Sequence, residues 1–269
     1  MARSARDPWR DGVAPHVPAR AGTLPAACLL PGDPARVDLA ATVLDDFEIV
    51  GHNREFRLGV GSLGGTPIAV CSTGIGGPST EIAVVELARL GVTTVLRTGG
   101  MGALTERIAA GSLCAVTRAV PGGGAAVPYA VGQDGRAAEP EVTRSLADEA
   151  AALGIALTEI TVASCDSYYL GQGRSLPGYE EQAATRYEEL RSLGVDGIDM
   201  ETETVLAVGR AMGLRAGAVL VAHANRATDA WLEDYEPAQL TMLRLAARTA
   251  RALSSAARPN PAPDSAARS

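Results

Sequence analysis

Three glycine-rich segments each follow a short apolar run, and two of them contain an arginine. They cover residues 29–36, 69–80 and 95–102. Glycine exposes the backbone N–H and tolerates positive φ, so we expect each apolar strand to end at its glycines. Arg36 in the first segment and Arg97 in the third can bind an oxyanion through two parallel hydrogen bonds. The pattern predicts an anion pocket at the edge of a sheet, with phosphate as its ligand.

Strand and helix signals alternate along the chain and would position these segments. Apolar, β-branched runs predict strands at 26–30, 67–71, 93–96, 112–119, 156–163 and 216–222. Helical spacing predicts helices at 36–44, 79–90, 141–153, 179–193, 202–212 and 237–256. This alternation predicts an α/β fold, a mostly parallel sheet flanked by helices. In such sheets ligands bind where strands end, which is where the glycine segments lie.

The two ends of the chain differ in composition from the rest. Residues 1–20 are rich in Arg, Pro and Ala, which predicts a flexible N-terminal arm. Residues 258–269 are rich in Pro, Ala and Ser, which predicts a disordered tail. Residues 21–257 are expected to form a single domain, since 269 residues suit one large α/β unit.

Composition and charge exclude several classes of function. Hydrophobic residues make up 46% of the chain and charged residues 20%, within the globular range. A net charge of −7 argues against a nucleic-acid partner or an anionic membrane surface. No apolar run approaches the ~18 residues of a membrane span, and no signal-peptide core follows the N-terminus. We therefore expect a cytoplasmic protein.

The four cysteines lie in separate segments without C-x-x-C spacing, at positions 28, 71, 114 and 165. Cys28 and Cys71 fall inside apolar runs, where a thiol behaves as a small hydrophobic side chain. We predict structural, reduced cysteines. A catalytic thiol is the alternative, but no histidine neighbours them in a recognisable arrangement.

Six segments follow one another in a recognisable order and spacing. They are Gly32-Asp33-Pro34-x-Arg36, Asn53-Arg54-Glu55-Phe56, residues 71–80, Leu96-Arg97-x-Gly99, Gly171-Gln172-Gly173-Arg174 and Asp199-Met200-Glu201-Thr202. Together they resemble the uridine phosphorylases of the nucleoside phosphorylase-I superfamily. The resemblance covers residues 14–255 and implies a three-layer α/β/α fold around a central mixed, mostly parallel twisted sheet. It also implies a pentosyltransferase.

The resemblance implies a phosphate site formed by Gly32, Arg36, Arg97 and the turn at Gly100, with Arg54 supplied by a neighbouring subunit. Three guanidinium groups around one dianion would each contribute roughly 1.5–3 kcal/mol. The alternative is that Arg36 and Arg54 are ordinary solvated surface arginines.

For the nucleobase, the resemblance implies that Gln172 and Arg174 bind a pyrimidine and that Tyr168 packs against it. An amide can both donate to and accept from a uracil edge, and a guanidinium favours charge that develops on the departing ring. The alternatives are a polar loop and an aromatic core residue.

For the ribose, the resemblance implies that Glu201 accepts hydrogen bonds from sugar hydroxyls and that Met200 packs on the sugar. A carboxylate can accept from both hydroxyls of a cis-diol. His16 would reach a neighbouring subunit's 5′-hydroxyl, or is simply part of a loose arm. Asp199 and Glu203 are interpreted as acids that favour a helix start.

A potassium ion between subunits is also implied, held by Glu55, Ile75 and Ser79. The alternative is that Glu55 pairs with a nearby arginine. No organic cofactor is expected, and inorganic phosphate would be the co-substrate.

Two departures from the family pattern bear on specificity. Gly100 and Met101 stand where the family has a threonine-containing turn, so a hydroxyl expected at phosphate and ribose is missing. His223 replaces an aliphatic residue before Asn225-Arg226 and is expected near the base, or else as a buried histidine under the loop. Asn225 cannot transfer a proton, which argues against a purine. A modified pyrimidine nucleoside is an alternative substrate.

These residues together predict an enzyme that cleaves a pyrimidine nucleoside with phosphate, giving free base and ribose 1-phosphate or its deoxy form. A homodimer would be the minimal active unit, and the family suggests a hexamer built as a trimer of dimers. The alternatives are a nucleosidase that uses water and a non-catalytic nucleoside-binding homologue. The missing threonine favours the first alternative, and the three arginines oppose it.

Overall fold

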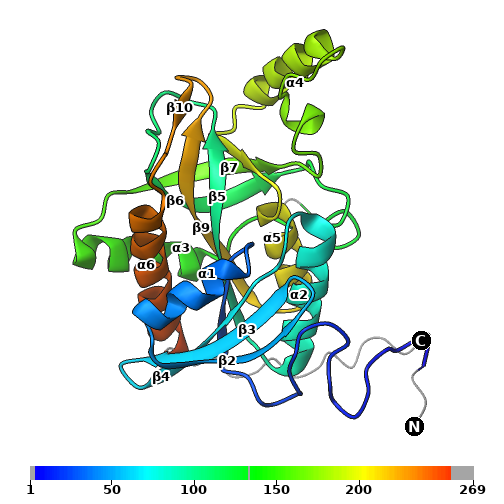
Figure 1. Cartoon of the computed structure of the whole chain (residues 1–269), viewed down its shortest axis with the longest axis vertical. Helices are drawn as coiled ribbons and strands as arrows, with labels where there is room; N and C mark the ends of the chain where they lie inside the picture. The colour runs from blue at the N-terminus through cyan, green and yellow to red at the C-terminus, as the bar shows by residue number, and fades with distance from the viewer. Residues whose placement is uncertain (1–3, 133, 256–269) are drawn as a thin grey trace.

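The fold is built on one mixed sheet, seen in a computed structural model that describes residues 4–132 and 134–255 (Figure 1). The strands are β1 (Ala27–Leu30), β2 (Asp45–Asn53), β3 (Phe56–Leu63), β4 (Thr66–Cys71), β5 (Thr94–Ala103), β6 (Leu113–Val120), β7 (Leu157–Ser164), β8 (Gly197–Asp199), β9 (Arg215–Asn225) and β10 (Ala230–Trp231). The helices are α1 (Ala35–Asp38), η1 (Leu39–Thr42), α2 (Gly77–Leu90), α3 (Pro140–Leu153), η2 (Leu170–Gln172), α4 (Glu180–Ser192), α5 (Thr202–Ala211) and α6 (Glu236–Ser255).

The strands follow the order β10-β9-β6-β7-β8-β5-β1-β4-β3-β2, with an additional pairing between β9 and β5. That pairing closes a ring, because β5 bonds both β9 and β8, while β6 and β7 complete the circuit. Parallel pairs form the centre, and the β2–β3–β4 meander is antiparallel. Open at one side and closed at the other, the sheet positions the ends of β1, β5, β8 and β9 close together.

Helices cover both faces of the sheet, which makes three layers. One apolar core lies under α2 and α5 and includes Leu87, Val205 and Leu206. The other lies under α3 and α6 and includes Val142, Leu146 and Leu245. Helices α2 and α5 pack together, as do α3 and α6 on the opposite side (Figure 1). The predicted three-layer fold with a mixed sheet is confirmed.

The expectation of a flexible arm at residues 1–20 is wrong for its second half. Ala14, Val17 and Ala19 are buried in the core beside α2. The carboxylate of Glu86, itself buried on α2, accepts hydrogen bonds from the backbone N–H groups of His16 (3.0 Å) and Val17 (2.7 Å). A buried carboxylate that needs donors, together with an apolar valine, fixes this segment. The predicted tail, 258–269, lies outside the described residues.

The third glycine segment is part of a strand, which corrects the expectation that the central strand ends near residue 96. Strand β5 continues through Gly99, Gly100 and Gly102 to Ala103. A Cβ on Gly99 would lie 2.5 Å from Nη2 of Arg97, so glycine leaves room for that guanidinium over the strand. Gly99 and Gly100 therefore serve close side-chain packing, which is the other common use of glycine inside a strand.

Candidate active site

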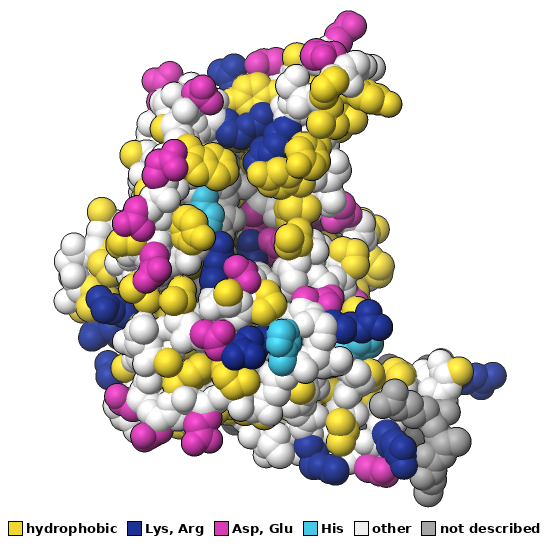
Figure 2. Space-filling model, in the orientation of Figure 1, with side chains coloured by type: hydrophobic (Ala, Val, Ile, Leu, Met, Phe, Trp, Pro, Cys, Tyr) yellow, Lys and Arg dark blue, Asp and Glu magenta, His cyan; other side chains and the backbone are white. Residues whose placement is uncertain are grey.

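A cavity of about 690 Å³ opens where β1, β5, β8 and β9 end. Figure 2 shows this face with a hollow in which basic side chains and a histidine gather beside hydrophobic ones. Most of the predicted site residues line the cavity: Gly32, Arg36, Glu55, Ile75, Arg97, Gly100, Tyr168, Gln172, Arg174, Met200, Glu201 and His223. His16, Arg54 and Ser79 are not among its lining residues.

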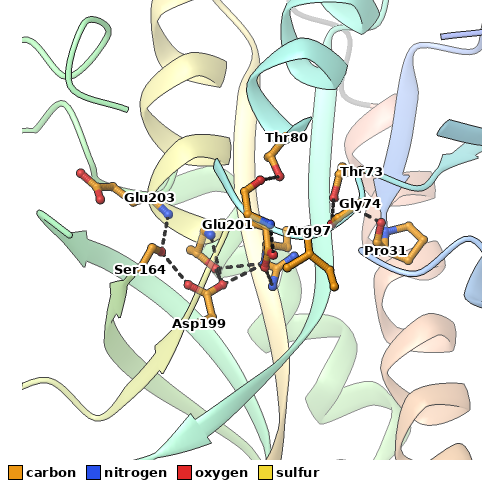
Figure 3. Close-up of polar contacts among 12 residues, drawn as sticks. Pro31, Thr73, Gly74, Thr80, Arg97, Ser164, Asp199, Glu201 and Glu203 are labelled. Atoms are coloured by element: carbon orange, nitrogen blue, oxygen red, sulfur yellow. Dashed lines mark hydrogen bonds and ion pairs between the residues drawn. The ribbon is translucent and has the colours of Figure 1, made fainter. Parts of the chain in front are cut away.

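The first two glycine segments lie side by side and form one wall. The N–H of Thr73 donates to the carbonyl of Pro31 at 2.9 Å (Figure 3). The N–H of Gly74 donates to the carbonyl of Gly32, also at 2.9 Å. A Cβ on Gly32 would lie 3.3 Å from the Gly74 carbonyl oxygen, so the approach is close. Helix α1 then places Arg36 at the cavity.

Arg97 is the centre of a buried ion network. Its Nε lies 3.0 Å from Oδ2 of Asp199, and its Nη2 lies 2.6 Å from Oε2 of Glu201 (Figure 3). Burial lowers the pKa of the Arg97 guanidinium, but the two carboxylates more than offset this and raise it. Arg97 is therefore a fixed cation at the floor of the cavity.

Asp199 supports this network and also begins α5. Its Oδ2 accepts from the Thr202 backbone N–H at 3.0 Å, and its Oδ1 accepts from the Ser164 hydroxyl at 2.5 Å. The helix-start interpretation thus agrees with the contact to Thr202, but the ion pair with Arg97 was missed. The sequence carried no signal for that pair, because Arg97 and Asp199 lie 102 positions apart.

Glu201 joins the ribose end of the predicted site to the second glycine segment. Its Oε1 accepts from the Gly76 N–H at 2.6 Å, where a φ of 92° favours glycine. Burial raises the pKa of the Glu201 carboxyl, opposed by the attraction of Arg97. One oxygen is thus fixed by a backbone amide and the other by a guanidinium, which orients the carboxylate in the cavity.

Glu203, by contrast, points away from this centre. It is buried and accepts from the N–H groups of Gly122 (2.9 Å) and Gly123 (2.8 Å), and it pairs with Arg136 at 2.5 Å. Glu203 therefore holds the loop after β6 and has no place in the cavity lining.

The opposite end of the cavity carries the predicted base-binding residues. The guanidinium of Arg174 lies over the ring of Tyr168, 4.0 Å from its centroid. Gln172 is buried, with its Nε2 3.5 Å from the Asp199 carbonyl oxygen. Arg226 bonds the backbone carbonyls of Gln172 and, at 2.9 Å, Gly173, and so fixes this loop. The structure brings Tyr168, Gln172 and Arg174 together at the lining of one cavity.

Asn225 serves the structure of its own loop. Its amide nitrogen donates to the carbonyls of Thr105 (2.9 Å) and Ile108 (2.6 Å). Its amide oxygen accepts from the backbone N–H groups of Ala227 and Thr228. All four groups of the amide are satisfied within the protein, so Asn225 has none left for a ligand.

Two further residues, one at the cavity and one behind it, were not predicted. Trp231 of β10 lies at the rim and is 62% exposed, and a two-residue strand offered no pattern by which to find it. Gln239 of α6 is buried, and its amide oxygen, when turned to Arg36, accepts from Nε and Nη2 at 3.1 Å each. A polar residue on the apolar side of the last helix was the available signal for Gln239.

Comparison with known proteins places the chain in a family. A sequence model of the Phosphorylase superfamily matches residues 26–258, so the chain belongs to this superfamily. The uridine phosphorylase of Thermococcus kodakarensis is 38% identical over 226 residues, which cover 83% of this chain and 82% of that protein. The Escherichia coli uridine phosphorylase is 38% identical over 202 residues, 74% of this chain and 79% of that protein. The predicted resemblance to uridine phosphorylases is confirmed.

Two further matches are named for purine nucleosides. A guanosine phosphorylase of Halorubrum lacusprofundi is 34% identical, over 78% of this chain and 83% of that protein. A solved structure of Toxoplasma gondii purine nucleoside phosphorylase, in complex with immucillin-H, has a TM-score of 0.78 and 26% identity. It covers 93% of this chain and 99% of that one.

Proposed function

We propose that the protein is a pentosyltransferase that cleaves a pyrimidine nucleoside with inorganic phosphate, giving free base and ribose 1-phosphate. One observation carries this proposal: a single cavity holds Arg36 and Arg97 at one end, Gln172 and Arg174 at the other, and Glu201 beside Arg97. The uridine phosphorylase relatives support the same assignment.

The chemistry needs positioning and charge rather than a covalent intermediate. The bond between C1′ of the sugar and N1 of the base breaks, and its electron pair goes to the base. A phosphate oxygen forms the new bond to C1′ from the opposite face. Arg36 and Arg97 would hold the dianion, and Gln172 and Arg174 would stabilise the charge on the leaving base.

Incubation with uridine, with and without phosphate, tests the proposal. We expect uracil release only with phosphate, together with ribose 1-phosphate. Release of uracil at the same rate without phosphate would instead identify a nucleosidase. Binding of uridine without any turnover would identify a non-catalytic homologue.

A panel of nucleosides defines the base. We expect uridine to be cleaved faster than guanosine, because the amide of Asn225 is fully used by its own loop and cannot protonate a purine. Cleavage of guanosine alone would contradict the pyrimidine assignment. Pyrimidines substituted on the ring belong in the same panel, since about 690 Å³ is ample for a substituted base.

We further propose that the active unit is an oligomer in which a neighbouring subunit supplies Arg54 and His16, with a hexamer as the full assembly. Arg54 sits at the turn between β2 and β3 with a φ of 54° and does not line its own cavity. Mixing an Arg54→Ala variant with a Glu201→Ala variant should restore activity in mixed oligomers, since one site then has both residues. No restoration, or an active monomer, would contradict the proposal.

We also propose that a potassium ion binds at the second glycine segment, residues 69–80. Glu55 and Ser79 both pack on Gly74, where a Cβ would lie 2.7 Å from Glu55 Cγ and 3.1 Å from Ser79 Oγ. The Ser79 hydroxyl also reaches the Ile75 carbonyl at 3.4 Å. Carboxylate, hydroxyl and carbonyl oxygens suit a hard cation. Thermal melts in potassium and in choline salts should differ for the wild type and agree for Glu55→Gln.

We place the activity in the cytoplasm, in pyrimidine salvage. The four cysteines support this, because all are unpaired and buried. Within the described segments, no helix has both the length and the apolar character that a bilayer crossing requires. Fractionation of cells that produce the protein, with uridine as sole pyrimidine source, tests both statements.

A further inference from the structure

A β-bulge delivers His223 into the cavity. Along the pairing of β5 with β9, Met101 faces Ala222 and Gly102 faces Ala224, so His223 is the extra residue between them. A bulge next to a site re-aims one side chain and is rarely incidental. His223 accordingly lines the cavity although both of its neighbours in β9 are buried.

Gly100 provides the room for this imidazole. A Cβ on Gly100 would lie 2.5 Å from Cε1 of His223 and closer still to Nδ1, a contact that protein structures do not tolerate. Glycine at position 100 and histidine at position 223 are thus one steric unit. Gly100 departs from the family pattern, and the structure gives the reason: only a residue without a side chain leaves space for the His223 ring.

The surroundings of His223 are those of the anion end. Arg36 and Arg97 both lower the pKa of the imidazole, after burial as the largest cause, to about 4. Tyr235, which precedes α6, packs on the ring with centroids 5.6 Å apart. The ring is therefore neutral at physiological pH and carries one N–H. Within the described structure its Nε2 is buried and has no hydrogen-bond partner.

We propose that the neutral imidazole of His223, which fills the space left by Gly100, donates a hydrogen bond to the phosphate held by Arg36 and Arg97. This inference rests on the proposed phosphorolytic function and moves His223 from the base, where the sequence suggested it, to the phosphate. A neutral donor fits here because Arg36 and Arg97 would repel a protonated imidazole. The donor is Nδ1, the ring nitrogen that meets position 100, whereas the buried Nε2, which has no partner among the described residues, is the nitrogen without a proton.

The test is calorimetric titration of inorganic phosphate into the wild type, His223→Ala, Gly100→Ala and the double variant. We expect the dissociation constant to rise about tenfold or more in His223→Ala, as for loss of a hydrogen bond to a charged group. Gly100→Ala should weaken binding similarly, because its Cβ displaces the ring. The double variant should bind no more weakly than His223→Ala, because the ring is then gone.

Nuclear magnetic resonance gives a readout independent of turnover, since the chain has three histidines. The His223 ring signal, assigned by its absence in His223→Ala, should shift on addition of phosphate, while that of exposed His52 should not.

The outcomes separate the two levels of the proposal. An unchanged phosphate dissociation constant in His223→Ala, with phosphate-dependent cleavage intact in the wild type, would overturn the role of His223 alone. If only the KM for uridine rose in His223→Ala, His223 would act at the base, and its proposed role in phosphate binding would also be overturned. If the wild type cleaves uridine without phosphate and does not bind phosphate, both proposals fail.

Discussion

Gln239 and Arg36 meet at the back of the anion end, where the amide oxygen can accept from two guanidinium nitrogens at 3.1 Å each. Burial and the nearby Arg97 lower the pKa of Arg36, so this cation is held at some cost. Helix α6 thus contacts Arg36 through Gln239 and orients a side chain that is predicted to bind phosphate.

The first prediction concerns this contact. Gln239→Leu should raise the KM for phosphate about fivefold to tenfold, because Arg36 loses a partner worth roughly 1–1.5 kcal/mol. The KM for uridine should stay within twofold. Thr241→Ala, at a half-buried position of the same helix, is the control. Equal rises in both KM values would show that α6 acts only through stability.

Glu201→Gln should separate sugar recognition from phosphate recognition. The substitution keeps the volume but removes the charge that pairs with Arg97 and one acceptor for the cis-diol. We expect kcat/KM for uridine to fall about 100-fold. The fall for 2′-deoxyuridine should be smaller, because that substrate lacks one hydroxyl. Equal losses on the two substrates would contradict a bond from Glu201 to the 2′-hydroxyl.

Asp199 should matter for stability more than any other acid in the site. Asp199→Ala removes one of the two carboxylates that pair with the buried Arg97 and also the acceptor for the Thr202 N–H at the start of α5. It should cost about 3 kcal/mol in urea unfolding. The matched control is Asp38→Ala, which breaks the exposed pair with Arg57. That control should cost less than about 1 kcal/mol. Similar costs for the two variants would refute a central role for the Arg97 network.

His223 predicts a particular dependence of stability on pH. Its pKa is about 4 in the folded protein, against about 6.5 when unfolded. Between these values the unfolded chain binds a proton that the folded protein does not, so the free energy of unfolding falls as pH falls from about 6.5 to about 4. His223→Asn should reduce this loss by an amount on the order of 2 kcal/mol. If the free energy of unfolding depended on pH in the same way in the wild type and in His223→Asn, this contribution of His223 would be ruled out.

Tyr168 should contribute to nucleoside binding through its packing with Arg174. Tyr168→Leu removes the ring beneath the guanidinium, and we expect the KM for uridine to rise about threefold to tenfold with the KM for phosphate unchanged. Tyr179→Leu is the matched control, since Tyr179 is similarly exposed and does not line the cavity. A similar rise in the KM for uridine in both variants would show a general effect on residues 165–180 and not a role of Tyr168 in binding.

The sequence predicted the main helices and strands well where apolar periodicity was clear. The predicted helix 141–153 is α3, and the predicted strand 67–71 is β4 within one residue. The hairpin of β2 and β3 was missed because Gly59 and Gly61 interrupt its pattern. Those glycines make room for Phe47, since a Cβ on Gly59 would lie 2.9 Å from Cε2 of that ring.

Glycine also explains what the sequence left unresolved at the site. A glycine that ends a strand and a glycine that accommodates a neighbouring side chain look the same in a sequence. At Gly76 the positive φ is the cause, whereas at Gly99 and Gly100 the cause is Arg97 and His223. Only spatial neighbours distinguish the cases, so the motif located the cavity but not its internal arrangement.

The closed ring of strands has a consequence for how specificity can change in this protein. Because β5 is bonded to β9 on one side and β8 on the other, neither strand can slip in register without breaking bonds around the whole circuit. The backbone is thus a rigid template, and adaptation to another ligand must come from reciprocal exchanges of side-chain volume across it. A library that varies positions 100 and 223 together should therefore contain functional variants that libraries of either position alone would lack.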